Sequence, residues 1–209
     1  MGHPRKLVSV VTMRSRRLEY SESTRSALVN SAVELFTKRG YANTSLDEVA
    51  KRARVTKGAL YHHFSGKQAL FEAAFAKVES QVFGRLEGIM GGSGTPWERA
   101  LAGLREFISS CLDPAYQRIA IHEAPVVMGW ERWREAEDRA SFGLVRSGLE
   151  DLIEAGEVDD VPVEITARLL FGALHSAATE IASSPDPKKV GAQVEAVIVQ
   201  LLHRLRRTP

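Results

Sequence analysis

Residues 44 to 67 contain two short helical segments separated by a tight turn, and this feature limits most strongly what the chain can fold into. Thr44 and Ser45 can cap the first helix, and the carboxylates of Asp47 and Glu48 fall in its first turn, where they suit the helix dipole. The inner side of this helix carries three apolar residues at helical spacing, Leu46, Val49 and Ala50. We therefore expect a short amphipathic helix that packs against a second one.

The second helix lies directly after the turn. Val55 closes the turn, Thr56 caps the helix, and Leu60 and Phe64, four residues apart, form its buried side. The other positions point outward or sideways, and they are Lys57, Gly58, Tyr61, His62 and His63. A short helix that presents these groups, supported by another short helix, is typical of a helix-turn-helix that contacts DNA.

The string Lys-Gly-Ala-Leu-Tyr-His-His-Phe at positions 57–64, followed by Lys67, resembles the N-terminal domain of the TetR family of bacterial transcriptional repressors. The resemblance includes Thr44-Ser45, Val49-Ala50 and Val55-Thr56 and spans about residues 23 to 75. The chain departs from the family at Arg54, where members often carry Gly in the turn before the recognition helix. If this position needs a positive φ, Arg54 is strained at a cost of about 1 kcal/mol. Its side chain could equally contact a phosphate.

We expect the recognition helix to contact both bases and phosphates. Lys57 lies near the helix N-terminus and is the candidate for a base contact, with guanine acceptors as the expected partners. Thr56 and Gly58 line the same approach, and Gly58 lets the backbone come close because it has no side chain. The alternative for Lys57 is a solvated lysine.

The resemblance implies further phosphate contacts around the recognition helix. Tyr61 and His63 are expected to hold phosphates, and His62 to reach either a base or the DNA backbone. The alternative for Tyr61 is a half-buried core residue. Flanking phosphates are expected to bind at the starts of two helices. The contacting residue is Ser45 or Thr44 at the first helix of the motif, and Lys67 at the helix that follows the motif.

The charge of the chain is distributed unevenly between its two parts. Residues 1 to 67 hold 13 Lys and Arg against 5 Asp and Glu, whereas the remainder holds 15 against 21. A basic head on an acidic body is what a DNA-contacting domain joined to a solvated regulatory domain would show. The alternative is a chance cluster of solvent-facing cations.

Helical periodicity continues along the rest of the chain, and no segment has the period of a strand. We expect an all-α protein of about nine helices in three parts: a basic flexible arm (1–20), a helix-turn-helix domain (21–66) and a helical ligand-binding and dimerisation domain (67–209). The arm could enter the minor groove, or it is a solvated tail, or Met13 is the true start. Outside the helix-turn-helix, we expect helices at about 23–39, 67–89, 96–111, 113–125, 130–155, 162–183 and 188–207.

The last two of these helices carry more apolar surface than a single small core can cover, which favours pairing with a second copy of the chain. The alternative is that both are buried within one chain. The resemblance implies such a homodimer, which would place two recognition helices roughly 34 Å apart on a pseudo-palindromic operator in double-stranded DNA. It also implies that a small-molecule effector enters the helical body and moves the helix that begins at Lys67.

The candidate ligand-binding residues lie on the central helices and combine aromatic bulk with a few polar atoms. They are Trp97, Phe107, Cys111, His122, Met128, Trp130, Phe142, Phe171 and His175. A histidine on an apolar helix face is usually satisfied by a carbonyl, so His122 and His175 are either structural or orient a ligand. The sequence does not encode the identity of the effector, the operator or the regulated genes.

Other classes of function find little support in the sequence. Cys111 is the only cysteine, which favours a reducing compartment, and no apolar run approaches the roughly 20 residues of a membrane span, so we expect a cytoplasmic protein with no membrane partner. His122-Glu123 could begin a zinc-hydrolase helix, but Val126 stands where the second histidine belongs, so we expect no enzyme, metal or cofactor. A metal- or redox-responsive regulator using Cys111, His122 and Glu123, or an activator of the same fold, stays an alternative.

Overall fold

The computed structural model describes residues 5–206, with side chains from residue 19 onward except those of residues 137, 139 and 140. Within that range it has ten α-helices and two π-helical segments, and the described residues form no strand beyond one isolated bridge between Val158 and Arg206. The expected all-α class is therefore confirmed, with ten α-helices instead of about nine. None of the described helices is long and apolar enough to cross a bilayer.

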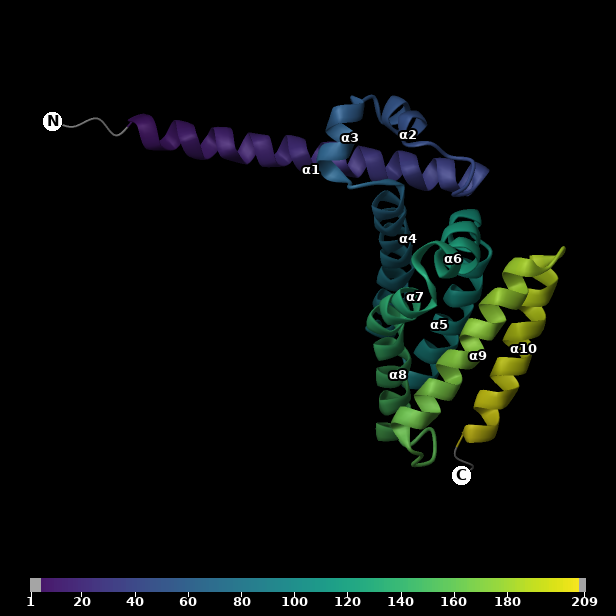
Figure 1. Ribbon diagram of the computed structural model, residues 1–209. Coiled ribbons are helices and arrows are strands. Elements are labelled where there is room, and N and C mark those ends of the chain that lie inside the picture. The colour runs from purple at the N-terminus through teal and green to yellow at the C-terminus, as the bar shows by residue number, and fades with distance from the viewer. Residues whose placement is uncertain (1–4, 207–209) are drawn as a thin grey trace. The chain divides into compact units, whose positions relative to one another are not determined.

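The chain divides into two compact units, residues 1–74 and 75–209. The first unit contains α1 (Arg5–Arg39), α2 (Leu46–Ala53), α3 (Lys57–His63) and the first turns of α4 (Lys67–Met90) (Figure 1). The expected division at residue 66 followed the Ser65-Gly66 break. The boundary between the two compact units lies inside α4, after Leu70 and Phe71, whose side chains are buried.

Helix α1 begins at Arg5 and not near residue 23. The DNA contact expected of the basic arm concerns residues 1–20, and the side chains of residues 1–18 lie outside the described residues. At the other end, α1 stops before Gly40 as expected. Gly40 has φ 79°, a left-handed conformation that glycine adopts without steric cost.

The core of the first unit forms where the inner stripe of α1 meets α2, α3 and α4. The expected core face of α1 is buried, and it consists of Leu28, Ala32, Leu35 and Phe36. Phe36 meets Phe71 of α4 edge to face, with ring centroids 5.3 Å apart, and Leu60 and Phe64 close the core from the side of α3. These contacts fix which face of α3 remains exposed.

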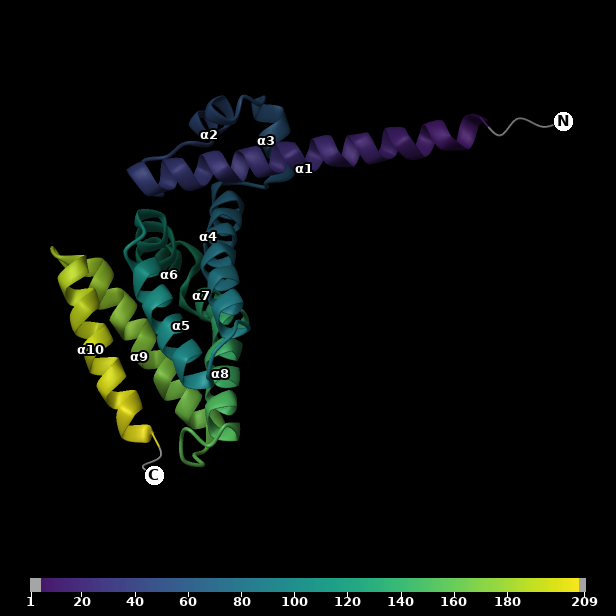
Figure 2. The same ribbon diagram turned by 180° about the vertical axis from the view of Figure 1, so that it is seen from behind.

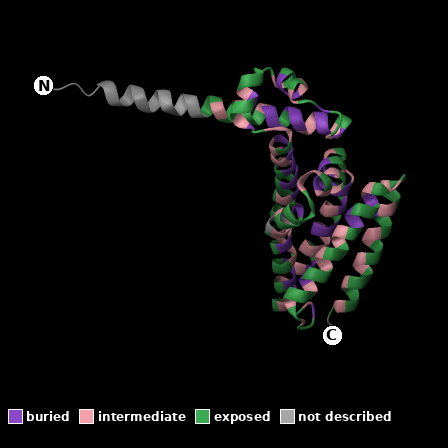
Figure 3. Ribbon diagram, viewed as in Figure 1, coloured by how far each residue is buried: buried purple, intermediate pink, exposed green. Residues whose placement is uncertain are grey.

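The second unit is a bundle in which α5 contacts α8, α9 and α10 (Figures 1 and 2). Its elements are α5 (Pro96–Cys111), η1 (Tyr116–Glu123), α6 (Ala124–Met128), α7 (Trp130–Glu137), η2 (Asp138–Phe142), α8 (Gly143–Glu154), α9 (Val163–Ser183) and α10 (Pro187–Leu205), of which η1 and η2 are π-helical. Helix α10 is mostly exposed or intermediate in Figure 3, and Gly191 is its one buried residue among those described.

Two of the expected helices in this unit differ from the structure. The segment expected to end near Pro125 continues to Met128, because Pro125 lies in the first turn of α6, where its missing N–H leaves no hydrogen bond unmade. The single helix expected over residues 130–155 is instead α7, η2 and α8 in succession. A π-helical turn takes up an extra residue and so rotates the helix faces on its two sides, which a 3.6-residue period does not predict.

Candidate nucleic-acid interface and ligand cavity

The outward face of α3 carries the residues expected to contact DNA. Lys57, Gly58, Tyr61 and His62 are exposed, and we call these four residues the recognition face. Tyr61 is 50% exposed, so it is not a core residue. The face is held in place because Leu60 and Phe64, on the opposite side of the helix, are buried. The side chains of a short helix are thereby presented to solvent on a rigid support.

Lys57 is engaged with the preceding helix. Its Nζ lies 2.9 Å from Oδ1 of Asp47, in the first turn of α2, and donates to Oδ2 at 3.1 Å, which raises the pKa of Lys57. Both side chains are largely exposed. Ion pairs in this setting are weak, so Lys57 can exchange the Asp47 carboxylate for a base edge or a phosphate. The expected base contact therefore requires a change of partner.

Thr56 and Gly58 shape the N-terminus of α3. The Thr56 hydroxyl accepts a hydrogen bond from the Ala59 N–H, so Thr56 is the N-cap, as expected. A Cβ built on Gly58 would lie 4.0 Å from Oγ1 of Thr56, an ordinary contact distance. Nothing inside the protein therefore requires glycine at position 58.

His63 lies beside the recognition face and is half-buried. Burial lowers its pKa, and the neighbouring His62 and Arg25 lower it further. The Arg25 guanidinium lies 5.2 Å from the centroid of the Phe64 ring, next to His63. The pKa of His63 is therefore lowered in the free protein, and a DNA phosphate beside the ring would raise it again.

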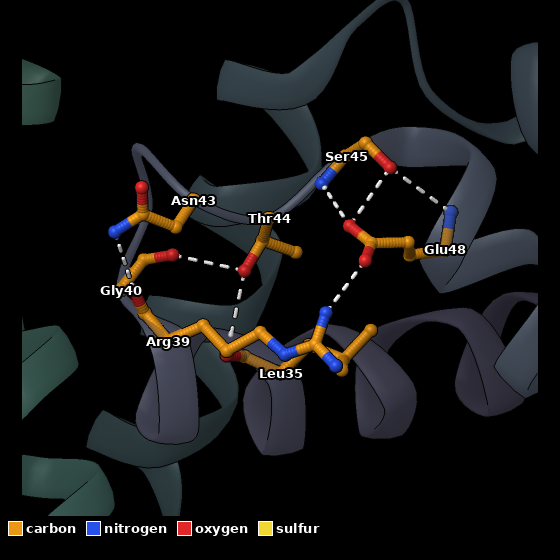
Figure 4. A network of polar contacts seen from close by, with 7 residues as sticks. All are labelled: Leu35, Arg39, Gly40, Asn43, Thr44, Ser45 and Glu48. Atoms are coloured by element: carbon orange, nitrogen blue, oxygen red, sulfur yellow. Dashed lines mark hydrogen bonds and ion pairs between the residues drawn. The ribbon is translucent and has the colours of Figure 1, made fainter.

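Thr44 and Ser45 differ in what their hydroxyls can do (Figure 4). Thr44 is buried and its hydroxyl donates to the Gly40 carbonyl at 2.9 Å, so a phosphate contact by this hydroxyl would have to break that hydrogen bond. Ser45 is exposed and forms a capping box with Glu48, whose carboxylate accepts from both the Ser45 N–H and its hydroxyl. A phosphate at the start of α2 would have to displace Glu48.

Lys67 is anchored at the turn between α1 and α2. Its Nζ donates to the Ala42 carbonyl at 3.2 Å and lies 4.4 Å from the centroid of the Tyr41 ring. A phosphate contact by Lys67 would share the ammonium group with this carbonyl. The structure thus gives Lys67 a folding role besides the DNA contact expected of it.

Arg54 adopts the left-handed backbone conformation in which a glycine would be unstrained. Its φ is 58° and its ψ is 39°, the one positive φ of a non-glycine residue within the described range. A non-glycine side chain in this region costs about 1 kcal/mol. The Arg54 side chain is exposed and has no ionic partner among the described residues, so it is free to contact a phosphate.

The second unit contains a cavity of about 200 Å³. Side chains from α4, α5, α8, α9 and α10 line it together with residues of both π-helical segments, including Tyr116 of η1 and Ser141 of η2. π-helical turns are rare and frequently lie at functional sites. The lining is mainly aliphatic and aromatic, as in sites that bind small organic molecules.

Three of the nine expected ligand-binding residues line this cavity: Phe107, Phe171 and His175. Burial lowers the pKa of His175, which favours the neutral imidazole. The other six expected residues lie outside the lining of this cavity, and they are Trp97, Cys111, His122, Met128, Trp130 and Phe142. Their positions follow from other contacts, since His122 meets the Ala182 carbonyl at 3.2 Å and Phe142 lies beneath the Arg168 guanidinium.

Trp133 is the most informative lining residue that the sequence did not single out. It is 3% exposed, and its indole Nε1 has no hydrogen-bond partner among the described residues. Its ring meets the His175 ring edge to face, with centroids 4.6 Å apart. Trp130, the expected residue, begins α7 and is 61% exposed.

The metal- or redox-responsive alternative gains no support from the described residues. They contain no group of three His, Cys, Asp or Glu side chains close enough to hold a metal ion. Cys111 is completely buried, and burial in apolar surroundings makes a thiol unreactive.

Comparison with known proteins places both units in one family. The family described as "Bacterial regulatory proteins, tetR family" matches residues 28–74, and "Tetracyclin repressor-like, C-terminal domain" matches residues 97–205. A solved TetR-family transcriptional regulator from Pectobacterium atrosepticum is 31% identical, with a TM-score of 0.82 over 91% of this chain and 98% of its own.

Two curated proteins are similar to parts of the chain. The transposon Tn10 TetC protein of Escherichia coli is 26% identical over 163 residues, which cover 76% of this chain and 80% of that protein. The HTH-type transcriptional regulator AcrR of Shigella flexneri is 39% identical over 75 residues, covering 36% of this chain and 34% of that protein. With the exposed recognition face and the helical second unit, these matches show that the chain belongs to the TetR family of helix-turn-helix transcriptional regulators.

Proposed function

We propose that the protein is a ligand-responsive transcriptional repressor that binds a pseudo-palindromic DNA operator as a homodimer in the cytoplasm. The observation that carries this proposal is the recognition face of α3, where Lys57, Gly58, Tyr61 and His62 are exposed on a helix whose other side is fixed in a core. A short helix of this kind fits the major groove, and Lys57 at its N-terminal end is in position to reach guanine acceptors.

A second copy of the chain would cover the exposed apolar side chains of the last two helices. Large apolar residues are exposed on α9 and on α10, namely Ile165, Leu169, Val197 and Leu201, each more than half exposed. On both helices they are four residues apart, so each pair forms a stripe along one side of its helix. Self-pairing of α9 and α10 would make a four-helix interface and remove this surface from water.

The cavity would receive the effector, and α4 would transmit its binding. Helix α4 contributes Val82, Phe83, Leu86 and Met90 to the lining, and the same helix begins at Lys67 in the first unit. A ligand that prefers one position of α4 shifts the population of conformers toward it. A tenfold loss of operator affinity requires about 1.4 kcal/mol of such coupling.

The test begins with selection of bound duplexes from a random DNA pool by the full-length protein. We expect a pseudo-palindromic consensus, binding of two protein chains per site, and affinity that falls steeply with salt concentration. The consensus is then placed, at its natural distance from the promoter, in front of a reporter gene. Lower reporter expression in the presence of the protein indicates repression, and higher expression indicates activation. An absence of salt-sensitive affinity for any duplex would overturn the proposal.

A further inference from the structure

We propose that the effector is an uncharged, mainly apolar molecule of about one ring, bearing an oxygen acceptor that takes the hydrogen bond of Trp133 Nε1. This inference rests on the proposed function, because it takes the cavity of the second unit to be the effector site. It adds the chemical class of the ligand and the residue that selects it.

The first observation is an unmet hydrogen-bond donor. Trp133 lines the cavity, is 3% exposed, and its Nε1 has no partner among the described residues. The indole N–H can only donate, and buried donors in folded proteins are almost always paired. An acceptor on a molecule bound in the cavity would satisfy this donor.

The second observation is the charge of the lining. None of the described residues that line the cavity is Asp, Glu, Lys or Arg. His175, the titratable imidazole in the wall, has a pKa lowered by burial and is therefore neutral at neutral pH. A charged ligand would lose its hydration without gaining a counter-charge from these residues, which disfavours it strongly.

The third observation is size. An apolar cavity of about 150 Å³ accommodates benzene, so the cavity of about 200 Å³ admits one ring with a small substituent. The rings of Trp133 and His175 meet edge to face, so the indole and the imidazole are neighbours in the wall. An acceptor on the substituent could then meet Trp133 while the ring contacts the apolar lining.

Three probes of matched size separate these requirements: acetophenone, α-methylstyrene and benzoate. α-Methylstyrene replaces the carbonyl oxygen of acetophenone by CH₂, and benzoate adds a negative charge. Calorimetric titration of the full-length protein without DNA gives each dissociation constant. We expect acetophenone to bind at least about tenfold more tightly than benzoate, because benzoate must be desolvated without a counter-charge.

The Trp133→Phe variant removes the N–H and keeps an aromatic ring. We expect it to weaken acetophenone by about five- to tenfold while α-methylstyrene changes by less than about twofold. Comparing the two probes across variants cancels the difference in their hydration, and retained α-methylstyrene binding shows that the cavity is intact. Trp97→Phe is the matched control, since Trp97 also carries a buried indole but does not line the cavity and packs on His203, and both probes should bind it as they bind the wild type.

A second measurement needs no change at Trp133. The chain has three tryptophans, so ¹H–¹⁵N spectra contain three indole signals, assigned with Trp97→Phe and Trp130→Phe. Acetophenone should shift the Trp133 signal downfield, and α-methylstyrene should not. Equal effects of the two probes, benzoate binding as tight as acetophenone, or no binding of either neutral probe would overturn this inference. These titrations contain no DNA, so such failures are distinguishable from failure of operator binding.

Discussion

The ammonium group of Lys67, at the first residue of α4, lies 4.4 Å from the centroid of the Tyr41 ring in the turn after α1. The same group donates to the neighbouring Ala42 carbonyl. The Tyr41 ring in turn contacts Phe36 and Phe71, with centroids 5.8 and 5.2 Å away. One cation therefore joins the start of α4 to the aromatic core of the first unit, at the place where a flanking phosphate is expected.

Replacing Lys67 by Met tests both roles, because Met keeps an unbranched stem and removes the charge. We expect lower affinity for every DNA sequence, a salt dependence flattened by about one phosphate contact, and a loss of about 0.5–1 kcal/mol of folding free energy from the cation–π contact. DNA titrations at several salt concentrations and thermal unfolding measure these effects. Lys77→Met, about 15 Å further along α4, is the control. Loss of stability with an unchanged salt slope would leave Lys67 a purely structural residue.

Lys57→Ala should weaken binding to the operator by about tenfold or more and leave unrelated DNA nearly unaffected, because a base contact carries sequence information. Asp47→Asn is the matched change in its partner, since it frees Lys57 and removes a negative charge beside the recognition face. That variant should bind all DNA somewhat more tightly. Competition between operator and unrelated duplexes measures both. If Asp47→Asn weakens binding as Lys57→Ala does, the pair serves to orient α3, and the base contact is wrong.

Gly58→Ala separates folding from recognition. The added Cβ meets only the Thr56 hydroxyl at 4.0 Å, and alanine raises helix propensity by up to about 1 kcal/mol, so the variant should fold at least as stably as the wild type. On DNA it should lose affinity, because the methyl group holds the duplex away from the helix N-terminus. Gly66→Ala, with no atom within 4 Å of the added Cβ, is the control and should change neither property. Wild-type DNA affinity in Gly58→Ala would refute the close approach.

The parts of this structure that the sequence predicts are those set by local spacing. The caps at Ser45 and Thr56, the buried pair Leu60 and Phe64, and the stop at Gly40 each depend on a few neighbouring residues. The capping box could also have been predicted, since a Ser followed three residues later by a Glu is its known pattern.

The parts that the sequence does not predict depend on distant contacts. Thr44 is turned inward because carbonyls of α1 and of Gly40 happen to lie within reach, which no local pattern encodes. The cavity depends on how many elements pack together, and π-helical η2 shifts which side chains of α7 and α8 face the same way. A 3.6-residue period does not predict that shift, so the sequence does not show that Trp133 lines the cavity.

A charge placed in the exposed stripes tests the proposed dimer. Leu169→Glu combined with Val197→Glu puts like charges into a surface that would otherwise be buried, so we expect monomers at concentrations where the wild type is dimeric. Val126→Glu is the control, since Val126 is 83% exposed and lies on α6, outside the stripes. Sedimentation equilibrium gives the masses. We also expect the monomeric variant to bind the operator more weakly, because its two half-sites are then bound independently. A dimer that survives the double substitution would place the interface elsewhere.

His175 should make the stability of the second unit depend on pH. Its pKa is lowered in the folded state, so below about pH 6.5 the unfolded chain binds the proton first and the free energy of unfolding falls as the pH falls. Above that pH the imidazole is neutral in both states and contributes no slope. All three tryptophans lie in the second unit, so tryptophan fluorescence follows its unfolding separately.

The wild type should therefore melt at a lower temperature at about pH 5.5 than at about pH 7, and His175→Phe, which keeps a ring against Trp133, should reduce that difference. The pKa of His63 is also lowered, but His63 lies in the first unit, which contains no tryptophan and so gives no tryptophan fluorescence. His63→Phe is accordingly the matched control and should leave the fluorescence-detected pH dependence unchanged. If His175→Phe retains the full pH dependence of the melting temperature, other groups cause that dependence. The lowered pKa of His175 is then contradicted.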